Sequence, residues 1–218
     1  MSAAFGIGAA AARLTRRRPL LVVDADEVLL RFVDGFDAFL RTQELFLDLT
    51  TYRLHGNVRR IADATPVLDV EVTALLDSFR GELDSLALVD GAAEALTALK
   101  PRLDIVVLTN IAESQAPARR RNLLAHGLDL PIVANSGAKG AAVRDLAAHA
   151  GRPAFFVDDI PQHLASSAEA APEIWRIHLI GDDRLKPLLP AATEAHLRAE
   201  NWPQAQRFIE AKLTEAGL

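Results

Sequence analysis

Two aspartates one residue apart, Asp24 and Asp26, are the side chains of this sequence best suited to chemistry. They follow four apolar residues, 20–23, of the kind that forms a strand buried on both faces. Alternation along an extended backbone points both carboxylates to the same side. Such a pair could hold a divalent cation, or one acid could attack a phosphorus while the other moves a proton. Taken alone, the motif also fits a strand that ends in two hydrated acids.

The rest of the sequence predicts the elements that position these acids. Further apolar runs predict strands at residues 104–110, 130–134, 153–159 and 175–180. Helical patterns alternate with them at residues 90–100, 116–126, 139–150 and 202–213. This alternation predicts a mainly parallel sheet of about five strands, in which Pro131 favours an edge position for its own strand. Chemistry in such sheets is expected beyond the carboxyl ends of the strands.

Residues 33–85 interrupt this alternation. Phe32, Phe36 and Leu40 recur at helical spacing, and a second apolar pattern predicts a helix within residues 67–79. No confident buried strand is predicted between the first and second strands of the sheet. The segment is therefore predicted to be a small helical insertion. Residues 1–18, which are Ala-rich and end in three arginines, are expected to form a frayed tail or a loosely docked helix rather than a secretory signal.

Composition excludes several classes of protein. The sequence has 218 residues, of which 50% are hydrophobic and 24% charged, as in globular rather than disordered chains. Its net charge of −5 argues against a general nucleic-acid partner. The absence of cysteine excludes disulfides, thiolate catalysis and Cys-ligated metal sites. No apolar run approaches the ~20 residues of a membrane span, so we expect no membrane partner and a cytoplasmic location.

Three predicted strands end in polar residues, and one predicted helix begins near a lysine. These residues are Asp24 and Asp26, Thr109 and Asn110, Asp158 and Asp159, and Lys139. Their order resembles the haloacid dehalogenase-like (HAD) hydrolase superfamily, with D-x-D after the first strand, Ser or Thr after the second, then a lysine and an acidic pair. The resemblance spans roughly residues 19–180. It implies an α/β fold with a Rossmann-like three-layer core, residues 1–32 and 86–218, and a helical cap, residues 33–85.

The resemblance also implies a Mg²⁺-dependent phosphatase that hydrolyses a small phosphomonoester through an aspartyl-phosphate intermediate. Asp24 would be the nucleophile and Asp26 the general acid and then base. Thr109, Asn110 and Lys139 would bind the phosphate, with Thr109 and Lys139 also serving catalysis. A cation in the first turn of a helix is unfavourable unless an anion lies nearby, which agrees with a phosphate beside Lys139.

The same resemblance implies the metal ligands. Asp159 would bind Mg²⁺ directly, with Asp158 bound directly or through water, together with Asp24 and the backbone carbonyl of Asp26. Mg²⁺ prefers oxygen ligands and keeps several waters, which suits a site with few carboxylates. Three residues depart from the common family pattern: Glu27 replaces glycine, Ile160 replaces a small hydroxyl residue, and His163 replaces Asp or Asn. We interpret His163 as a hydrogen-bonding helix residue rather than a metal ligand.

Within the insertion, the Tyr52–Arg60 passage groups an aromatic ring, a histidine and several guanidinium groups. Arg53, His55 and Arg59 are candidate substrate contacts, and arginine would suit an anionic small metabolite. A solvated polar face is the alternative interpretation. For the whole protein, a phosphomutase, a dehalogenase and a non-catalytic HAD-like binding protein are the alternatives. The dehalogenase branch lacks the second acid of D-x-D, whereas Asp26 is present.

Overall fold

The apolar run that precedes Asp24 forms the central strand, β1 (Leu20–Val23), and all four of its residues are buried. The computed structural model describes residues 4–15 and 17–218, and within them β1 belongs to a six-stranded sheet of order β5-β4-β1-β6-β7-β8. Every pairing in this sheet is parallel. The other strands are β4 (Asp104–Asn110), β5 (Ile132–Asn135), β6 (Ala154–Asp158), β7 (Trp175–Leu179) and β8 (Leu197–Ala199).

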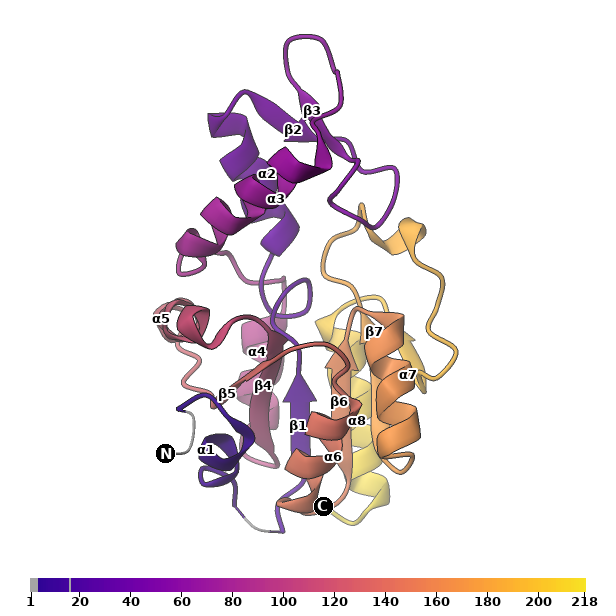
Figure 1. The fold of residues 1–218 in the computed structure, drawn as a ribbon. Coiled ribbons are helices and arrows are strands. Elements are labelled where there is room, and N and C mark those ends of the chain that lie inside the picture. Colours follow the sequence, from indigo (N-terminus) through magenta and orange to yellow (C-terminus); the bar gives the residue numbers. More distant parts are fainter. Residues whose placement is uncertain (1–3, 16) are drawn as a thin grey trace.

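Helices cover both faces of the sheet, which gives three layers (Figure 1). They are α1 (Ile7–Ala11), α4 (Ala92–Leu99), α5 (Ala116–Ala125), α6 (Gly140–Ala148), α7 (Pro161–Ala170) and α8 (Trp202–Glu215). Leu20 and Val22 of β1 pack with residues of α6 and α7 in one apolar cluster, whereas Leu21 and Val23 pack with α4 and α8 in another. The period of two along β1 therefore divides the core into two apolar layers.

A second group of elements lies above the carboxyl ends of the strands (Figure 1). It consists of α2 (Phe32–Thr42), β2 (Leu45–Leu47), β3 (Val58–Arg60), α3 (Asp69–Phe79) and the 3₁₀ turn η1 (Arg80–Glu82). Its two connections to the core run side by side, because Arg31 N donates to Ala87 O and Val89 N donates to Leu29 O, each at 2.9 Å or less. The α2 and α3 helices meet through Phe32, Phe36, Phe39 and Phe79, whose rings pack against one another.

The structure confirms the predicted α/β class, the parallel sheet and the edge position of the strand that follows Pro131. It corrects two details. The sheet has six strands rather than about five, because β8 pairs with β7. The insertion is not purely helical, because β2 and β3 form an antiparallel hairpin. Among the described helices, none is long and apolar enough to cross a membrane.

The amino-terminal segment docks more closely than a frayed tail would. Helix α1 contacts α6 and β5, and Ala10 is buried in the same cluster as Leu20. Residues 1–3 and 16 of the predicted tail lie outside the described residues. Two short 3₁₀ turns, η2 (Glu113–Gln115) and η3 (Lys186–Leu188), complete the described elements.

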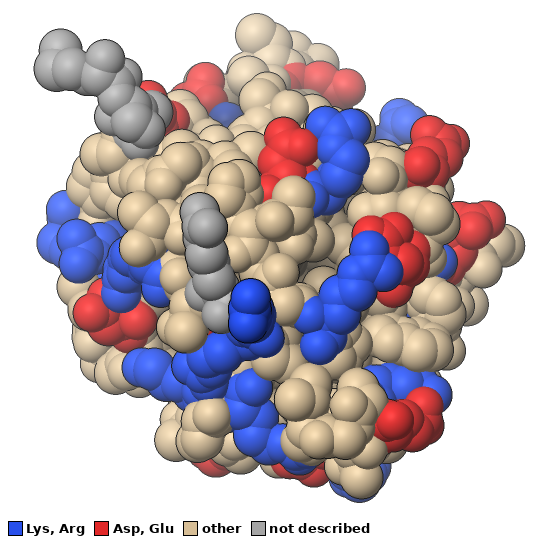
Figure 2. Space-filling model, turned by 90° about the horizontal axis from the view of Figure 1, so that it is seen from below, with Lys and Arg blue, Asp and Glu red and all other residues tan. Residues whose placement is uncertain are grey.

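Basic side chains gather on the face at the amino ends of the strands, opposite the insertion (Figure 2). Several of them are neutralised locally. Arg18 pairs with Asp104 at 3.0 Å, and Arg152 pairs with Glu173 at 3.1 Å. These pairs are partly or largely exposed, so each contributes only ~0–1 kcal/mol to stability.

Candidate active site

The acids converge because β1 and β6 are adjacent and in register. Val23 pairs with Val157, and the backbone N–H of Asp24 donates to Val157 O at 3.0 Å. Leu20 and Val22 face the layer of α6 and α7, and so does Phe156. Alternation carries Asp24 and Asp158 to that same face, one residue beyond each strand's last apolar side chain. Both carboxylates are buried, with residue exposures of 6% and 0%.

Lys139 links these two acids. It is the residue that precedes the first turn of α6, and its side chain is fully buried. Its ammonium lies 2.7 Å from Asp24 Oδ1 and 2.8 Å from Asp158 Oδ2. Burial disfavours its charge, but the two carboxylates outweigh this effect and raise the pKa of Lys139. The lysine therefore stays protonated and anchors the acids of two strands.

The same pairing affects the acids differently. Burial raises the pKa of Asp24 to about 6, because its desolvation outweighs the attraction of Lys139. Burial also acts to raise the pKa of Asp158, but Lys139 and then His163 bring this pKa below its usual value. The anionic form is therefore favoured more strongly at Asp158 than at Asp24, and a further positive charge near Asp24 would lower its pKa.

Both oxygens of Asp158 have protein partners. Lys139 holds Oδ2, while Oδ1 accepts from the backbone N–H of Ile160 at 2.9 Å and lies 3.1 Å from His163 Nδ1. Because a carboxylate only accepts, Nδ1 of His163 is the donor. Nε2 of His163 lies 3.3 Å from Asn110 Nδ2. This placement agrees with the interpretation of His163 as a hydrogen-bonding residue, and Ile160 needs only its backbone here.

Asp159 completes the acidic cluster. One carboxylate oxygen from each of Asp24, Asp158 and Asp159 lies within 4.8 Å of the others. Burial, then Asp158 and Asp24, raise the pKa of Asp159 well above its usual value. The Asp159 carbonyl accepts at 2.9 Å from Nε2 of His178, whose Nδ1 accepts from Ala192 N at 3.2 Å. This neutral histidine fixes the backbone of the acid pair.

The cluster fits a hard divalent cation. All the donors are carboxylate oxygens, which Mg²⁺ prefers, and their mutual repulsion is relieved by a cation. Among the described residues, no hydrogen bond is donated to Asp24 Oδ2 or Asp159 Oδ1, so both oxygens remain for a metal. Asp158, whose two oxygens are engaged, fits an indirect role through Lys139 or a water. The Asp26 side chain does not belong to the cluster.

Asp26 forms an ion pair with Arg119 of α5 instead. The Arg119 side chain is fully buried, and that of Asp26 is 30% exposed. Among the described residues, Nε and Nη1 of Arg119 have no hydrogen-bond partner. A buried guanidinium with free donors is costly, so this pair indicates a constrained position for the Asp26 carboxylate.

Thr109 and Asn110 lie at the carboxyl end of β4, on the same edge of the sheet as the acids. Thr109 is buried and pairs in register with Ala134, one position before Asn110 pairs with Asn135. Asn110 Nδ2 donates to Gly137 O at 3.0 Å, and its Oδ1 accepts from Asn135 at 2.7 Å. Asn110 thus connects β4 to the loop that follows β5, and its contact with a phosphate stays a prediction.

Glu27 occupies a strained turn between the acids and the insertion. Its φ of 55° lies in the left-handed region that favours glycine, which explains why glycine suits this position. Its Oε1 accepts from Val33 N, at the start of α2, at 2.7 Å, and its Oε2 has no partner among the described residues. Burial raises the pKa of Glu27 to about 8. Glu27 therefore joins the loop of the acids to the first helix of the insertion.

Tyr52 is the residue of the insertion that reaches the acids. Its hydroxyl donates to Asp159 Oδ2. The three predicted substrate contacts have other partners. His55 Nε2 is 3.0 Å from Thr73 Oγ1, and Arg59 Nε lies 3.5 Å from Asp48 Oδ2. The backbone carbonyl of Arg53 accepts a hydrogen bond from the Asn57 side chain. Among the described residues, none of these three side chains contacts an acid of the cluster. Their role as substrate contacts stays a prediction.

Sequence reasoning did not predict Arg119 and His178 as members of the site, and it placed Tyr52 in the candidate substrate passage without predicting its contact with Asp159. Tyr52 and Arg119 contact their acids across 107 and 93 residues of sequence. No local spacing reports contacts of this kind. His178 lies in β7, next to β6, and pairs in register with Asp158, which is a relationship that only the assembled sheet shows.

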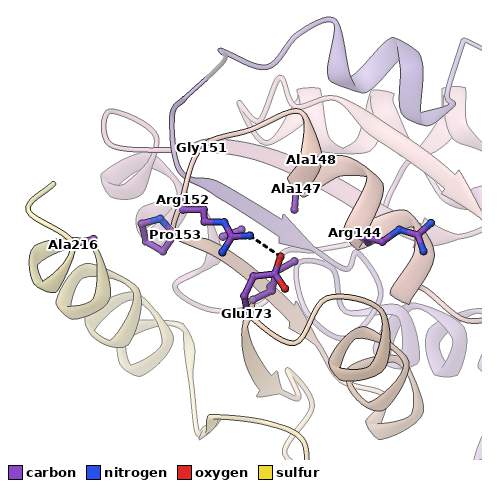
Figure 3. Close-up of a pocket in the computed structure, with 10 residues that line it drawn as sticks. Arg144, Ala147, Ala148, Gly151, Arg152, Pro153, Glu173 and Ala216 are labelled. Carbon is purple, nitrogen blue, oxygen red and sulfur yellow. Dashed lines mark hydrogen bonds and ion pairs between the residues drawn. The ribbon is translucent and has the colours of Figure 1, made fainter.

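A separate hollow of about 400 Å³ lies at the opposite end of the sheet (Figure 3). It is lined by small residues such as Ala147, Pro153 and Ala154, with Arg144 at its rim. Glu173, the acid that lines it, is paired with Arg152. The hollow therefore offers no unpaired carboxylate, and no residue of the acidic cluster lines it.

Comparison with known proteins identifies the fold. No protein-family model matches this sequence, and no curated protein matches it. Solved structures do match over most of their length. A HAD-superfamily hydrolase of subfamily IA from Geobacter sulfurreducens has 22% sequence identity and a TM-score of 0.55, covering 91% of this chain and 98% of that one.

Two further structures extend this result. The HAD hydrolase YfnB from Bacillus subtilis, bound to magnesium, has 14% identity and a TM-score of 0.55 over 89% of this chain and 99% of that one. CbbY from Rhodobacter sphaeroides, in complex with xylulose-(1,5)bisphosphate, has 16% identity and a TM-score of 0.53, covering 85% of this chain and 95% of that one. The chain therefore has the HAD-like fold, as the order of its motifs predicted.

Proposed function

We propose that this protein is a Mg²⁺-dependent phosphatase that hydrolyses a small phosphomonoester through an aspartyl-phosphate intermediate. The observation that carries the proposal is the buried cluster of Asp24, Asp158 and Asp159 with Lys139 at its centre. The magnesium-bound and sugar-bisphosphate-bound neighbours of the same fold support it. Residues 33–85 would be a cap over this site, and residues 1–32 and 86–218 the catalytic core.

In the first step, a carboxylate oxygen of Asp24 would attack the phosphorus, and the bond from phosphorus to the ester oxygen would break. The departing oxygen would take a proton from Asp26 and leave as an alcohol. In the second step, Asp26 would remove a proton from water, whose oxygen would attack the phosphorus. Inorganic phosphate would then leave, and Asp24 would return as a carboxylate.

Other residues would prepare these steps. Lys139 orients Asp24 and would offer its charge to a phosphoryl oxygen, together with the Thr109 hydroxyl and the Asn110 amide. Asp159, Asp24 and the carbonyl of Asp26 would hold Mg²⁺, with Asp158 acting through Lys139 or a water. When bound, Mg²⁺ would screen the repulsion between the phosphate and the acids. Arg119 would set the position of Asp26.

A phosphatase assay against a panel of phosphorylated metabolites, with Mg²⁺ and with EDTA, tests the proposal. Hydrolysis should require the metal, and Asp159→Ala should raise the metal concentration that gives half-maximal rate. Full activity in EDTA would contradict the metal-dependent mechanism. Transfer of phosphate within a sugar phosphate, without net release, would identify a phosphomutase. Absence of any turnover, with phosphate binding retained, would identify a non-catalytic binding protein.

The substrate would enter between the cap and the core. Arg53, His55 and Arg59 remain proposed contacts for an anionic leaving group, although they make other contacts in this closed arrangement. Their joint replacement by alanine should impair the preferred substrate more than a generic aryl phosphate. Equal losses on both substrates would assign the passage to a solvated face. A cytoplasmic location also remains a prediction.

A further inference from the structure

Tyr52 makes a contact that joins the cap to the acidic cluster. Its phenol, from the loop between β2 and β3, donates a hydrogen bond to Asp159 Oδ2. Asp159 itself is buried, with 4% of its surface exposed. The contact is therefore partly shielded from water, which strengthens a hydrogen bond to a carboxylate.

The loop that carries Tyr52 is held in place by Asn57. The buried Asn57 side chain donates to the carbonyl oxygens of Thr51 and Arg53, on either side of Tyr52. Its Oδ1 accepts from Thr50 Oγ1 at 2.9 Å. Asn57 thus shapes the loop. The position of the phenol is fixed by the cap's own structure.

The Asp159 carboxylate has fewer side-chain partners than the neighbouring acids, so its orientation depends more on the Tyr52 phenol. Lys139 forms ion pairs with Asp24 and Asp158, and Arg119 forms one with Asp26. Among the described residues, Asp159 has no ion pair, and Tyr52 supplies the hydrogen bond to its carboxylate. That bond engages Oδ2 and leaves Oδ1 for the interior of the cluster.

We infer that Tyr52 is a positioning residue for the divalent cation, which holds Asp159 in the orientation that binds the metal when the cap is closed. The inference rests on the metal site of the proposed function. A hydrogen bond to a ligating carboxylate orients the ligand, and loss of such an outer partner costs ~10–100-fold in metal affinity. Because Tyr52 belongs to the cap, metal affinity and cap closure are coupled, and each favours the other.

Calorimetric titration of the metal-free, full-length protein with Mg²⁺ tests this inference. Tyr52→Phe removes one hydroxyl and should raise the Kd by ~10-fold or more. Thr73→Val is the matched control, because it removes a hydrogen bond to His55 within the same cap but away from the acids. The control should leave the Kd unchanged. An unchanged or lower Kd for Tyr52→Phe, or an equal rise in both variants, would overturn the inference.

A spectroscopic measurement on the unmutated sequence gives an independent readout. The sequence contains one tyrosine, so incorporation of 3-fluorotyrosine labels position 52 alone. Addition of Mg²⁺ should shift its ¹⁹F resonance, because the acid that accepts its hydrogen bond acquires a cation. A resonance that does not respond, or a protein that binds no Mg²⁺, would overturn the inference.

The two proposals can fail separately. Metal-dependent hydrolysis with no effect of Tyr52→Phe on the Kd would refute the positioning role and leave the phosphatase. Tyr52-dependent Mg²⁺ binding in a protein that hydrolyses no phosphomonoester would do the reverse.

Discussion

Arg119 holds Asp26 by an ion pair that joins α5 to the loop after β1, across 93 residues of sequence. The proposed proton donor is therefore not a freely rotating carboxylate. The Arg119 side chain is fully buried, whereas that of Asp26 is 30% exposed. If Asp26 is the proton donor, removal of Arg119 should affect the chemical step.

Replacing Arg119 by methionine should lower kcat by at least ~10-fold while changing KM little, since general acid–base catalysis is worth ~10²–10⁴-fold. Arg119→Lys should recover only part of kcat, because an ammonium keeps the charge but not the planar fork. Steady-state kinetics of both variants on one phosphomonoester checks this. Wild-type kcat in the methionine variant would rule out a positioning role for Arg119.

Asp24→Asn should abolish turnover and leave the fold intact. The carboxamide is nearly isosteric, but it is not an anionic nucleophile. Turnover of the purified variant and its thermal unfolding midpoint provide the measurements. Asp129→Asn is the control, since Asp129 is an acid 54% exposed at a surface pair with Arg13. If the Asp24 variant kept wild-type turnover, the nucleophile would lie elsewhere.

Glu27→Gln should make folding stability less dependent on pH in the presence of EDTA. Burial raises the pKa of Glu27 from 4.5 to about 8, so the folded state keeps a proton that the unfolded state has lost. Stability contributed by the neutral carboxyl is full below pH 4.5 and is lost as the pH rises through about 8. Glutamine stays neutral throughout and can still accept from Val33 N.

Denaturant unfolding of both proteins at about pH 5 and about pH 8.5 measures this effect. The free energy of unfolding of the glutamine variant, relative to wild type, should rise by a few kcal/mol between these conditions. The comparison cancels the titration of Asp24 and Asp159, which both proteins share. A difference that did not change with pH would mean that Glu27 is ionised in the folded protein.

Gly140→Ala should destabilise the protein. A Cβ at Gly140 would lie 2.0 Å from the backbone oxygen of Ser166, so α6 and α7 would have to separate. Overpacking of this kind typically costs ~1–3 kcal/mol. Gly81→Ala is the control, because a Cβ there meets nothing within 4 Å. Equal unfolding free energies for the two variants would show that the contact between α6 and α7 yields easily.

The main elements of the fold could be predicted because each carries its own local pattern. The buried strands β1, β4 and β6 are continuous apolar runs, and glycine or proline marks the ends of α4 and α5. β8 escaped prediction because it has only three residues, Leu197–Ala199, with an arginine at its centre. It is a strand because β7 presents a free edge to it, which is a property of the assembled sheet. The hairpin of β2 and β3 is equally short.

The residues of the candidate site likewise fall into those with a local sequence signal and those whose contacts arise only from packing. Asp24, Lys139 and Asp159 could be predicted because each ends a strand or begins a helix at the same edge of the sheet. The contacts of Tyr52 and Arg119 depend on how the cap and α5 pack against that edge, which no local period encodes. The sequence shows Glu27 where the family pattern has glycine, and the left-handed backbone of this residue explains why glycine suits the position.

The central place of β1 in the sheet has a consequence for how the protein is made. During synthesis β1 emerges before every other strand, yet Leu20 pairs with Asp104 on one side and Ala154 on the other. The ribosome must therefore release the whole cap before β1 gains its first neighbour, and α6 before it gains the second. The insertion, in which α2 packs against β2 and α3 and β2 pairs with β3, can assemble in the meantime, whereas closing β1 between distant partners is intrinsically slow. Until then this apolar strand has no neighbour in the sheet, and unpaired apolar strands of this kind are prone to aggregate.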